Sequence, residues 1–474
     1  MRSFVVVVLG LAACQFDKSG VGAGGIDAPI GSADANVDAM VDASQVGCKC
    51  SGNTLSGCQG QPDMVCDLGC STTGGAHCKQ IVPSNGVPLT DLNGVTAALE
   101  TTSAGQINSR HEYTIDTDTG EILDYGVDGF PTNPTPTTIR AAGTGVLSGM
   151  EFDTAGAVNV LGVDSLHIAS DSTLYGFGTH PLAILSRGDV LIEGDIDFSA
   201  GCYDQQGDFN YSCAGPGGGV GGTQAGGATG CGPGANGVAG HATGGGGGGM
   251  STKGGNGGDY SNGNKGGAGG SMASCPGPTL EPLAGGGGGG VAAAGAGGDG
   301  GGGGGGLQIT SLTSITVTHP VNASNTSEIY VGGQGGRGTP TTNGGGGGGG
   351  AGGAILLEAI TVTVSSGGVL AANGGGGGGG RITGTTADGG GGTSTTSQAL
   401  GGAGDGVGGN TGRGGLGGSA LGMASPGSGP QNQDGTGGGG GAAGRVRLNA
   451  KPAGVDTTTG IVSPVASVGQ IPVQ

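Results

Sequence analysis

Short runs of alternating apolar and polar residues recur from about residue 137 onward, and glycine or aspartate separates them. Alternation over a few residues is typical of a strand with one buried face, and no segment shows the roughly 3.6-residue period of an amphipathic helix. Upstream, in a mixed region over residues 80–134, Tyr113–Asp116 and Glu121–Leu123 flank the turn residues Asp118–Gly120, which predicts a hairpin. The pattern therefore predicts an all-β fold.

One strand pattern occurs four times along the chain. The copies begin at Leu182, Leu307, Ala354 and Arg445, and in each a short apolar strand is followed by a second one. This repeat predicts a stack of β-coils that bury their inward side chains against one another. The coils resemble the right-handed parallel β-helices of bacterial surface adhesins and polysaccharide-acting enzymes, and a β-sandwich is the alternative. The expected order is coils over 135–200, a glycine-rich region over 201–449 with strands at 307–318, 354–372 and 445–449, and a C-terminal tail over 450–474.

Glycine accounts for 127 of the 474 residues and is concentrated between residues 201 and 449. Runs such as Gly245–Gly249 and Gly344–Gly350 form helices or strands only at high cost, because glycine loses more backbone entropy on ordering than other residues. Two outcomes remain. The runs are either disordered loops or polyproline-II strands in a bundle, where the missing side chain permits close backbone approach.

The amino terminus has the features of an export signal. Arg2 precedes an apolar stretch from Phe4 to Ala13, which is too short to span a bilayer. The sequence Leu11-Ala-Ala-Cys14 resembles the lipobox of bacterial lipoproteins, and this resemblance implies cleavage before Cys14 and a lipid on its thiol. Gln15 resembles the outer-membrane sorting signal of that family. The resemblance places the protein in the cell envelope, as an outer-membrane lipoprotein facing the periplasm or the cell surface, and an ordinary signal peptide is the alternative.

Residues 14–46 predict a disordered acidic tether, because low hydrophobicity and repeated aspartates keep a chain extended. Such Asp-Ala stalks resemble those of surface lipoproteins from myxobacteria. Residues 47–79 follow as a cysteine-rich module that is too small to bury a core of its own. Ten cysteines behind a signal peptide predict disulfides, with zinc as the alternative for the first six. These cysteines are Cys48, Cys50, Cys58, Cys66, Cys70, Cys78, Cys202, Cys213, Cys231 and Cys275.

Charge and motifs restrict the function. The chain carries 15 basic and 34 acidic residues, a net charge of −19, and no basic cluster, so a nucleic acid is not an expected partner. No nucleotide-binding, serine-hydrolase or metal-ligand motif has the required context, so no cofactor and no metal is predicted. The expected partners are the membrane, through the N-terminal lipid, and a surface polysaccharide or matrix.

The sequence predicts a structural or adhesive surface protein without evident catalysis. The alternative is a polysaccharide hydrolase or lyase on the same scaffold. Its candidate carboxylates are Asp195 and Asp197, which alternate with Ile196 and so lie on one face of a strand about 7 Å apart. Inverting glycosidases require two carboxyl groups roughly 6.5–9.5 Å apart.

Overall fold

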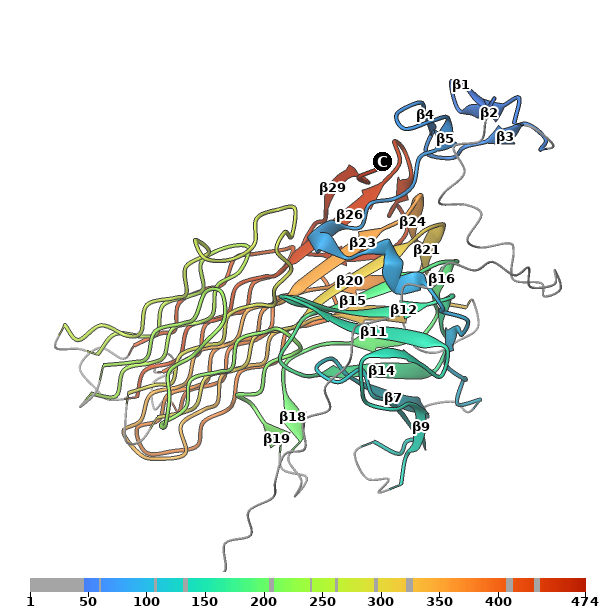
Figure 1. The fold of residues 1–474 in the computed structure, drawn as a ribbon. Helices are drawn as coiled ribbons and strands as arrows, with labels where there is room; N and C mark the ends of the chain where they lie inside the picture. The colour runs from blue at the N-terminus through green and yellow to red at the C-terminus, as the bar shows by residue number, and fades with distance from the viewer. Residues whose placement is uncertain are drawn as a thin grey trace, which may run out of the picture.

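The structure is a computed structural model that describes residues 47–474, apart from residues 59–60, 106–108, 131–134, 204–208, 239–240, 261–262, 294–296, 321–326, 406–411 and 430–434. The predicted signal peptide, Cys14 and the predicted tether lie outside the described residues. The described chain is all-β, as predicted, and its helical segments are the short 3-10 turns η2 (Ser84–Gly86) and η3 (Leu89–Leu92) (Figure 1).

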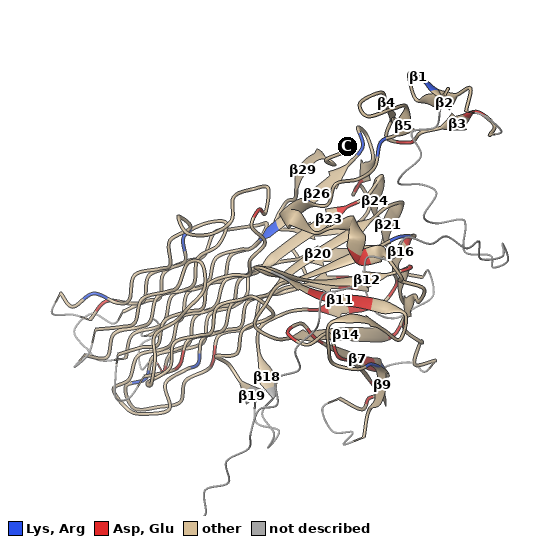
Figure 2. Cartoon of the chain, in the orientation of Figure 1, with Lys and Arg blue, Asp and Glu red and all other residues tan. Residues whose placement is uncertain are grey.

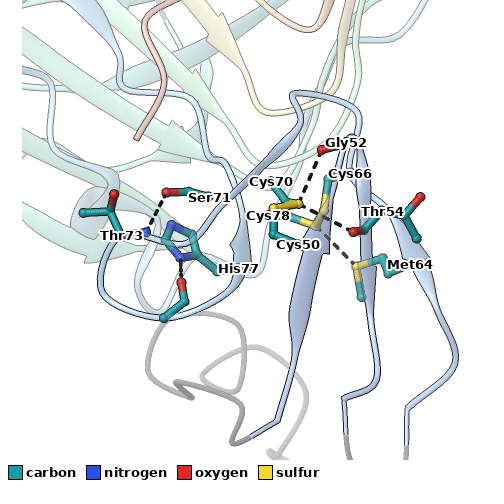
Figure 3. The surroundings of a disulfide bond; sticks show 11 residues. Cys50, Gly52, Thr54, Met64, Cys66, Cys70, Ser71, Thr73, His77 and Cys78 are labelled. Carbon is teal, nitrogen blue, oxygen red and sulfur yellow. Dashed lines mark hydrogen bonds between the residues drawn. A yellow bond between two sulfur atoms is a disulfide. The ribbon is translucent and has the colours of Figure 1, made fainter.

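The cysteine-rich module forms a small knob. Strands β1 (Lys49–Ser51), β2 (Thr54–Ser56) and β3 (Met64–Val65) make one antiparallel sheet, and β4 (Cys70–Ser71) pairs with β5 (His77–Cys78). Three disulfides join Cys48 to Cys58, Cys50 to Cys70, and Cys66 to Cys78. Figure 3 shows the cysteines of the second and third of these. Disulfides compensate for a hydrophobic core too small to hold such a fold. The six cysteines are therefore disulfide-bonded, and the zinc alternative is wrong.

Three larger sheets form the body of the protein (Figure 1). The first sheet has the order β10 (Gly145–Leu147), β11 (Met150–Ala155), β12 (Val158–Val163), β15 (Leu182–Ser186), β20 (Gly306–Ser311), β23 (Ala354–Glu358), β26 (Arg445–Ala450) and β29 (Ser467–Gln470). The second has the order β6 (Leu99–Glu100), β13 (Leu166–Ile168), β16 (Val190–Ile192), β21 (Ser314–Val317), β24 (Thr361–Val364) and β27 (Val455–Asp456). The third has the order β9 (Thr137–Arg140), β8 (Ile122–Val127), β7 (His111–Asp116), β14 (Ser172–Phe177), β17 (Asp195–Asp197), β22 (Ser327–Tyr330), β25 (Gly368–Ala371) and β28 (Ile461–Ser463).

The chain visits the three sheets in turn. Each circuit, such as β12, β13 and β14, adds one strand to every sheet, and the next circuit pairs with it in parallel. The inward side chains form ladders; in the first sheet Leu161, Ile184, Ile309, Leu357 and Leu448 stand in register and are fully buried. The four copies of the sequence repeat thus supply β15, β20, β23 and β26, which are neighbouring strands of the first sheet. Residues 450–474, expected as a tail, continue the same pattern with β27, β28 and β29.

Antiparallel strands form the ends of the first and third sheets that lie opposite β29 and β28. The predicted hairpin is confirmed as β7 and β8, and β9, β10 and β11 add further antiparallel pairs. Arg140 is fully buried there, because its guanidinium donates hydrogen bonds to the carbonyls of Gly120, Gly143 and Gly145 at 2.8 Å. It also lies over the ring of Phe152, 5.4 Å from the centroid. Backbone acceptors and an aromatic face thus compensate for burial of this cation.

A buried carboxylate attaches the segment before β6 to the first sheet. Glu358 is fully buried and accepts hydrogen bonds from the amide and the hydroxyl of Ser84, at 3.0 and 2.7 Å. Gln308, Thr310 and Asn449 donate to it at 3.0, 3.1 and 3.0 Å. A carboxylate with five donors is stable away from water, since every donor and acceptor is satisfied.

The glycine-rich chain between β17 and β20, β22 and β23, and β25 and β26 forms a bundle beside the sheets (Figure 1). Its backbone hydrogen bonds have a three-residue period. The amides of Gly245 and Gly248 donate to Gly346 and Gly349, whereas those of Gly246 and Gly249 donate to Ala235 and Gly232. Three residues per turn is the period of polyproline II. Of the two predicted outcomes, the ordered bundle is confirmed for the described residues.

Composition decides where each segment lies in the bundle. The run 344–350 exchanges hydrogen bonds with several other segments and is buried throughout. At the edge, the segment 253–259 has exposed residues at Lys253, Asn256 and Asp259, while the glycines between them are buried. Pure glycine therefore marks the interior, and Gly-Gly-X triplets mark the surface. Disulfides Cys202–Cys213 and Cys231–Cys275 fasten segments of the first and longest excursion.

Candidate functional site

Asp195 and Asp197 lie on β17 in the third sheet. Ile196 between them is fully buried in the core. Because side chains alternate along a strand, both carboxylates are on the outer face of the sheet, as predicted. The two aspartates differ in exposure, since Asp195 retains only 8% of its accessible surface and Asp197 is partly buried.

The register of the third sheet brings further polar residues beside them. Thr173 on β14 is paired with both Glu112 and Asp195, and Tyr175 is paired with Asp197, which in turn pairs with Tyr330. The backbone amide of Glu328 donates to Asp195 Oδ1 at 3.1 Å. We call this surface the acid–tyrosine face. It comprises Arg110, Glu112, Thr173, Tyr175, Asp195, Asp197, Glu328 and Tyr330.

Arg110 and burial act on Asp195 in opposite directions. The guanidinium Nη1 of Arg110 contacts Asp195 Oδ2 and donates to the Thr173 hydroxyl at 3.0 Å. Burial nevertheless dominates and raises the pKa of Asp195 to about 7, opposed by the Arg110 charge and assisted by Glu328. Desolvation disfavours the charged carboxylate more than the cation favours it.

The neighbouring acids are shifted in the same direction. Burial raises the pKa of Glu112, whose carboxylate accepts the Phe130 amide at 2.7 Å. Burial also raises the pKa of Asp197, against hydrogen bonds from Ser199. Phe130 covers this side of the face, with its ring 5.2 Å from Tyr175 and 5.5 Å from Phe177. The face combines four carboxyl groups with aromatic rings, a composition suited to contact with sugars.

The geometry meets one requirement of glycoside hydrolysis and falls short of another. Two residues apart on a strand, Asp195 and Asp197 have the roughly 7 Å spacing that an inverting pair needs. A raised pKa also suits a general acid. However, both oxygens of Asp195 are already engaged, one by Arg110 and the other by the Glu328 amide. A proton donor has to reach the leaving group, so these contacts favour a structural role for Asp195.

Sequence reasoning did not single out Glu112, Glu328 or Arg110 as partners of these aspartates. Glu112 and Glu328 are 83 and 133 residues from Asp195 in the sequence, and only the register of β7, β14, β17 and β22 places them together. Alternation in the sequence could have placed these glutamates on the outer face of the sheet, because Glu112 and Glu328 are each followed by an inward residue, Tyr113 and Ile329.

Other polar residues near these strands in sequence form separate pairs. His180 contacts Asp118 at 2.6 Å, His167 contacts Glu193 at 3.1 Å, and Arg187 contacts Asp164 at 2.8 Å. Pairs at this degree of exposure contribute little to stability. Across the part of the chain that the structure describes, no three His, Cys, Asp or Glu side chains are arranged to hold a metal ion.

Comparison with known proteins assigns no relationship. No family model matches the chain, and neither curated proteins nor solved structures give a significant match. In the described ranges, no helix has the length and apolar character required to cross a bilayer. Function is therefore inferred from the site and the architecture.

The carboxyl group of Asp195 is expected to titrate near pH 7 in the folded protein. Its ordinary pKa is 3.8, so the folded state holds this proton more tightly than the unfolded chain and loses stability as the pH rises from about 4 to about 7. Replacement Arg110→Gln removes the cation and is expected to raise the midpoint further. Carboxyl ¹³C chemical shifts measure both midpoints, and Glu281→Gln at an exposed position is the control. A wild-type midpoint below pH 5 would contradict the prediction.

Proposed function

We propose that this chain is a lipid-anchored protein of the cell envelope with a structural or adhesive role, and that its body is a parallel β-helix. The observation that carries the proposal is the ordered glycine bundle beside the sheets. It is a rigid element built almost entirely from backbone, and such an element suits the presentation of a surface better than the turnover of a substrate.

The bundle is rigid because each interior segment is in contact with several neighbouring segments through its backbone. Gly348 donates to Gly290 and accepts from Gly301, both at 2.9 Å, while its Cα faces the carbonyl of Gly246. Without side chains in the interior, the segments have no rotamers to order and approach closely. Charged residues lie toward the edges and turns of the bundle (Figure 2). Among them, Lys265 contacts Asp259 at 2.7 Å. Polar groups held on a stiff support favour contact with an extended polymer.

The proposed anchor is the lipid on Cys14. Multiple acyl chains hold a protein stably at a membrane, whereas one chain is marginal. Cells expressing the wild-type chain are expected to incorporate radioactive fatty acid into it, and cells expressing Cys14→Ser are expected to show no label. Equal labelling of the two proteins would exclude a lipid on this cysteine.

The adhesive role is tested with a glycan array. The full chain carrying Cys14→Ser avoids association driven by lipid, and it is expected to retain polysaccharides of the envelope or matrix without degrading them. Reducing-end assays on each retained glycan measure turnover. An array with no retained polysaccharide would contradict the adhesive proposal.

The second candidate is a polysaccharide hydrolase, supported by the spacing of Asp195 and Asp197 and by the raised pKa of Asp195. It predicts release of reducing ends from a bound glycan, and a loss of at least 100-fold in this rate for Asp197→Asn. Binding without turnover would exclude it.

A further inference from the structure

A pocket lies where the glycine bundle meets the last coil of the body. Its volume is about 320 Å³, at the small end of ligand sites and suited to a single sugar unit. Five separate stretches of the chain contribute to its wall. The residues that line it are Ser251, Pro278, Ser419, Ala420, Gly444, Arg445, Val446, Pro464, Val465 and Ser467.

Among the described residues that line this wall, Arg445 is the one with a charge, and the Nε of its guanidinium has no hydrogen-bond partner. It begins β26 opposite Ala354, and its buried Nε makes no hydrogen bond with any described residue. Burial lowers its pKa. Arg447, two residues along the strand, donates from Nε to Asn449 Oδ1 at 2.8 Å, so its Nε has the partner that the Nε of Arg445 lacks. A buried N–H without an acceptor is costly, and an anion in the pocket would supply the acceptor that Nε lacks.

The other polar groups of the wall are acceptors. The hydroxyls of Ser251 and Ser419 donate to the carbonyls of Ala443 and Thr396, each at 2.7 Å. Ser467 donates to Pro278 at 3.1 Å. Since their protons are used, these oxygens offer lone pairs to donors on a ligand, such as sugar hydroxyls. None of the described residues that line the pocket carries a carboxylate. Glu358 on the same sheet already accepts five hydrogen bonds.

We propose that this pocket binds a uronic acid unit of an acidic polysaccharide, with the Arg445 guanidinium donating hydrogen bonds to its carboxylate. The serine oxygens accept hydrogen bonds from the hydroxyls of the sugar ring. Pro278, Pro464 and Val465 contact the apolar face of the ring. The inference deepens the proposed adhesive function, because it names the polymer that the protein holds.

The net charge of −19 does not prevent this contact. At physiological ionic strength, charges are screened over about 8 Å, so the groups near the pocket decide which ligand enters. Arg445 is the charged residue in the wall, and none of the described residues that line the pocket is acidic. The local field therefore favours a carboxylate even though the whole molecule is acidic.

Calorimetric titration of the full chain carrying Cys14→Ser tests the assignment with sodium glucuronate, glucuronate methyl ester, glucose and inorganic phosphate. Glucuronate is expected to bind, and the ester and glucose are expected to bind at least 10-fold more weakly. Arg445→Gln is expected to weaken glucuronate at least 10-fold. Arg447→Gln is the matched control and is expected to leave the affinity within about twofold, since its partner is Asn449.

Several outcomes would overturn the inference. These are equal affinity for glucuronate and its ester, an unchanged affinity in Arg445→Gln, or phosphate binding as strong as glucuronate, which would indicate a general anion site. Circular dichroism melting curves establish that each variant folds. Retention of neutral glycans on the array with no glucuronate binding would overturn this inference alone, whereas glucuronate binding without retention of any polymer would overturn the adhesive role alone.

Discussion

Replacing Gly348 with alanine is expected to disrupt the glycine bundle and lower its stability by about 3 kcal/mol or more. The added Cβ would lie inside van der Waals contact with the carbonyl of Gly246. The amide and carbonyl of Gly348 already bond to Gly290 and Gly301, so the segment has no free direction in which to move. The obstacle is backbone, which cannot rotate away as a side chain does. Urea unfolding followed by circular dichroism measures the loss.

Gly226→Ala is the matched control for this substitution. A Cβ at Gly226 meets no atom within 4 Å, so the change is expected to alter the free energy of unfolding by less than about 0.5 kcal/mol. Proteolysis of the bundle at a fixed temperature gives a second measurement, because a disrupted interior exposes its turns. Similar behaviour of the two variants would show that the interior segments are not packed as described.

Replacing Glu358 with leucine is expected to cost about 3–5 kcal/mol, because several buried donors lose their acceptor at about 1–3 kcal/mol each. Leucine leaves the amide and hydroxyl of Ser84 and the side-chain amide of Asn449 without their acceptor. Gln308 keeps the Ser84 carbonyl and the Thr310 hydroxyl as acceptors. Buried donors that lose their partner carry the full cost of desolvation. The segment containing Ser84 is expected to loosen first, because it loses two of its hydrogen bonds to the first sheet and keeps those that Gln308 makes with Ser84 and Asn85. Urea unfolding and cleavage near residue 84 by trypsin-like or broad proteases measure the two effects.

Glu358→Gln keeps the shape and one acceptor, so a smaller loss is expected than for leucine. Glu281→Gln, at an exposed glutamate, is expected to change nothing. If Glu358→Leu were as stable as wild type, the network would contribute no stability and the segment would be held by its apolar contacts alone. Val87 and Leu92, which pack with Val160 and Leu185, provide those contacts.

The sequence by itself determined the fold class, the hairpin and the strand repeat. Alternation of apolar and polar residues places Ile196 inward and Asp195 and Asp197 outward without reference to any other strand. The five disulfides were indicated as a class by an even number of cysteines, but not their pairing, because pairing depends on which strands meet. Lipidation of Cys14 stays a prediction.

Only the tertiary structure decided the state of the glycine runs and the composition of both sites. Glycine carries no side chain whose pattern marks an inside and an outside, so order in the bundle depends on which segments surround a run such as 344–350. Glu328 joins Asp195 through strand register, and Arg445 reaches a pocket whose wall spans residues 251 to 467. Local periodicity reports on one strand at a time. Contacts between residues hundreds of positions apart arise where successive circuits of the chain pair. No local sequence pattern shows which residues of different circuits are paired.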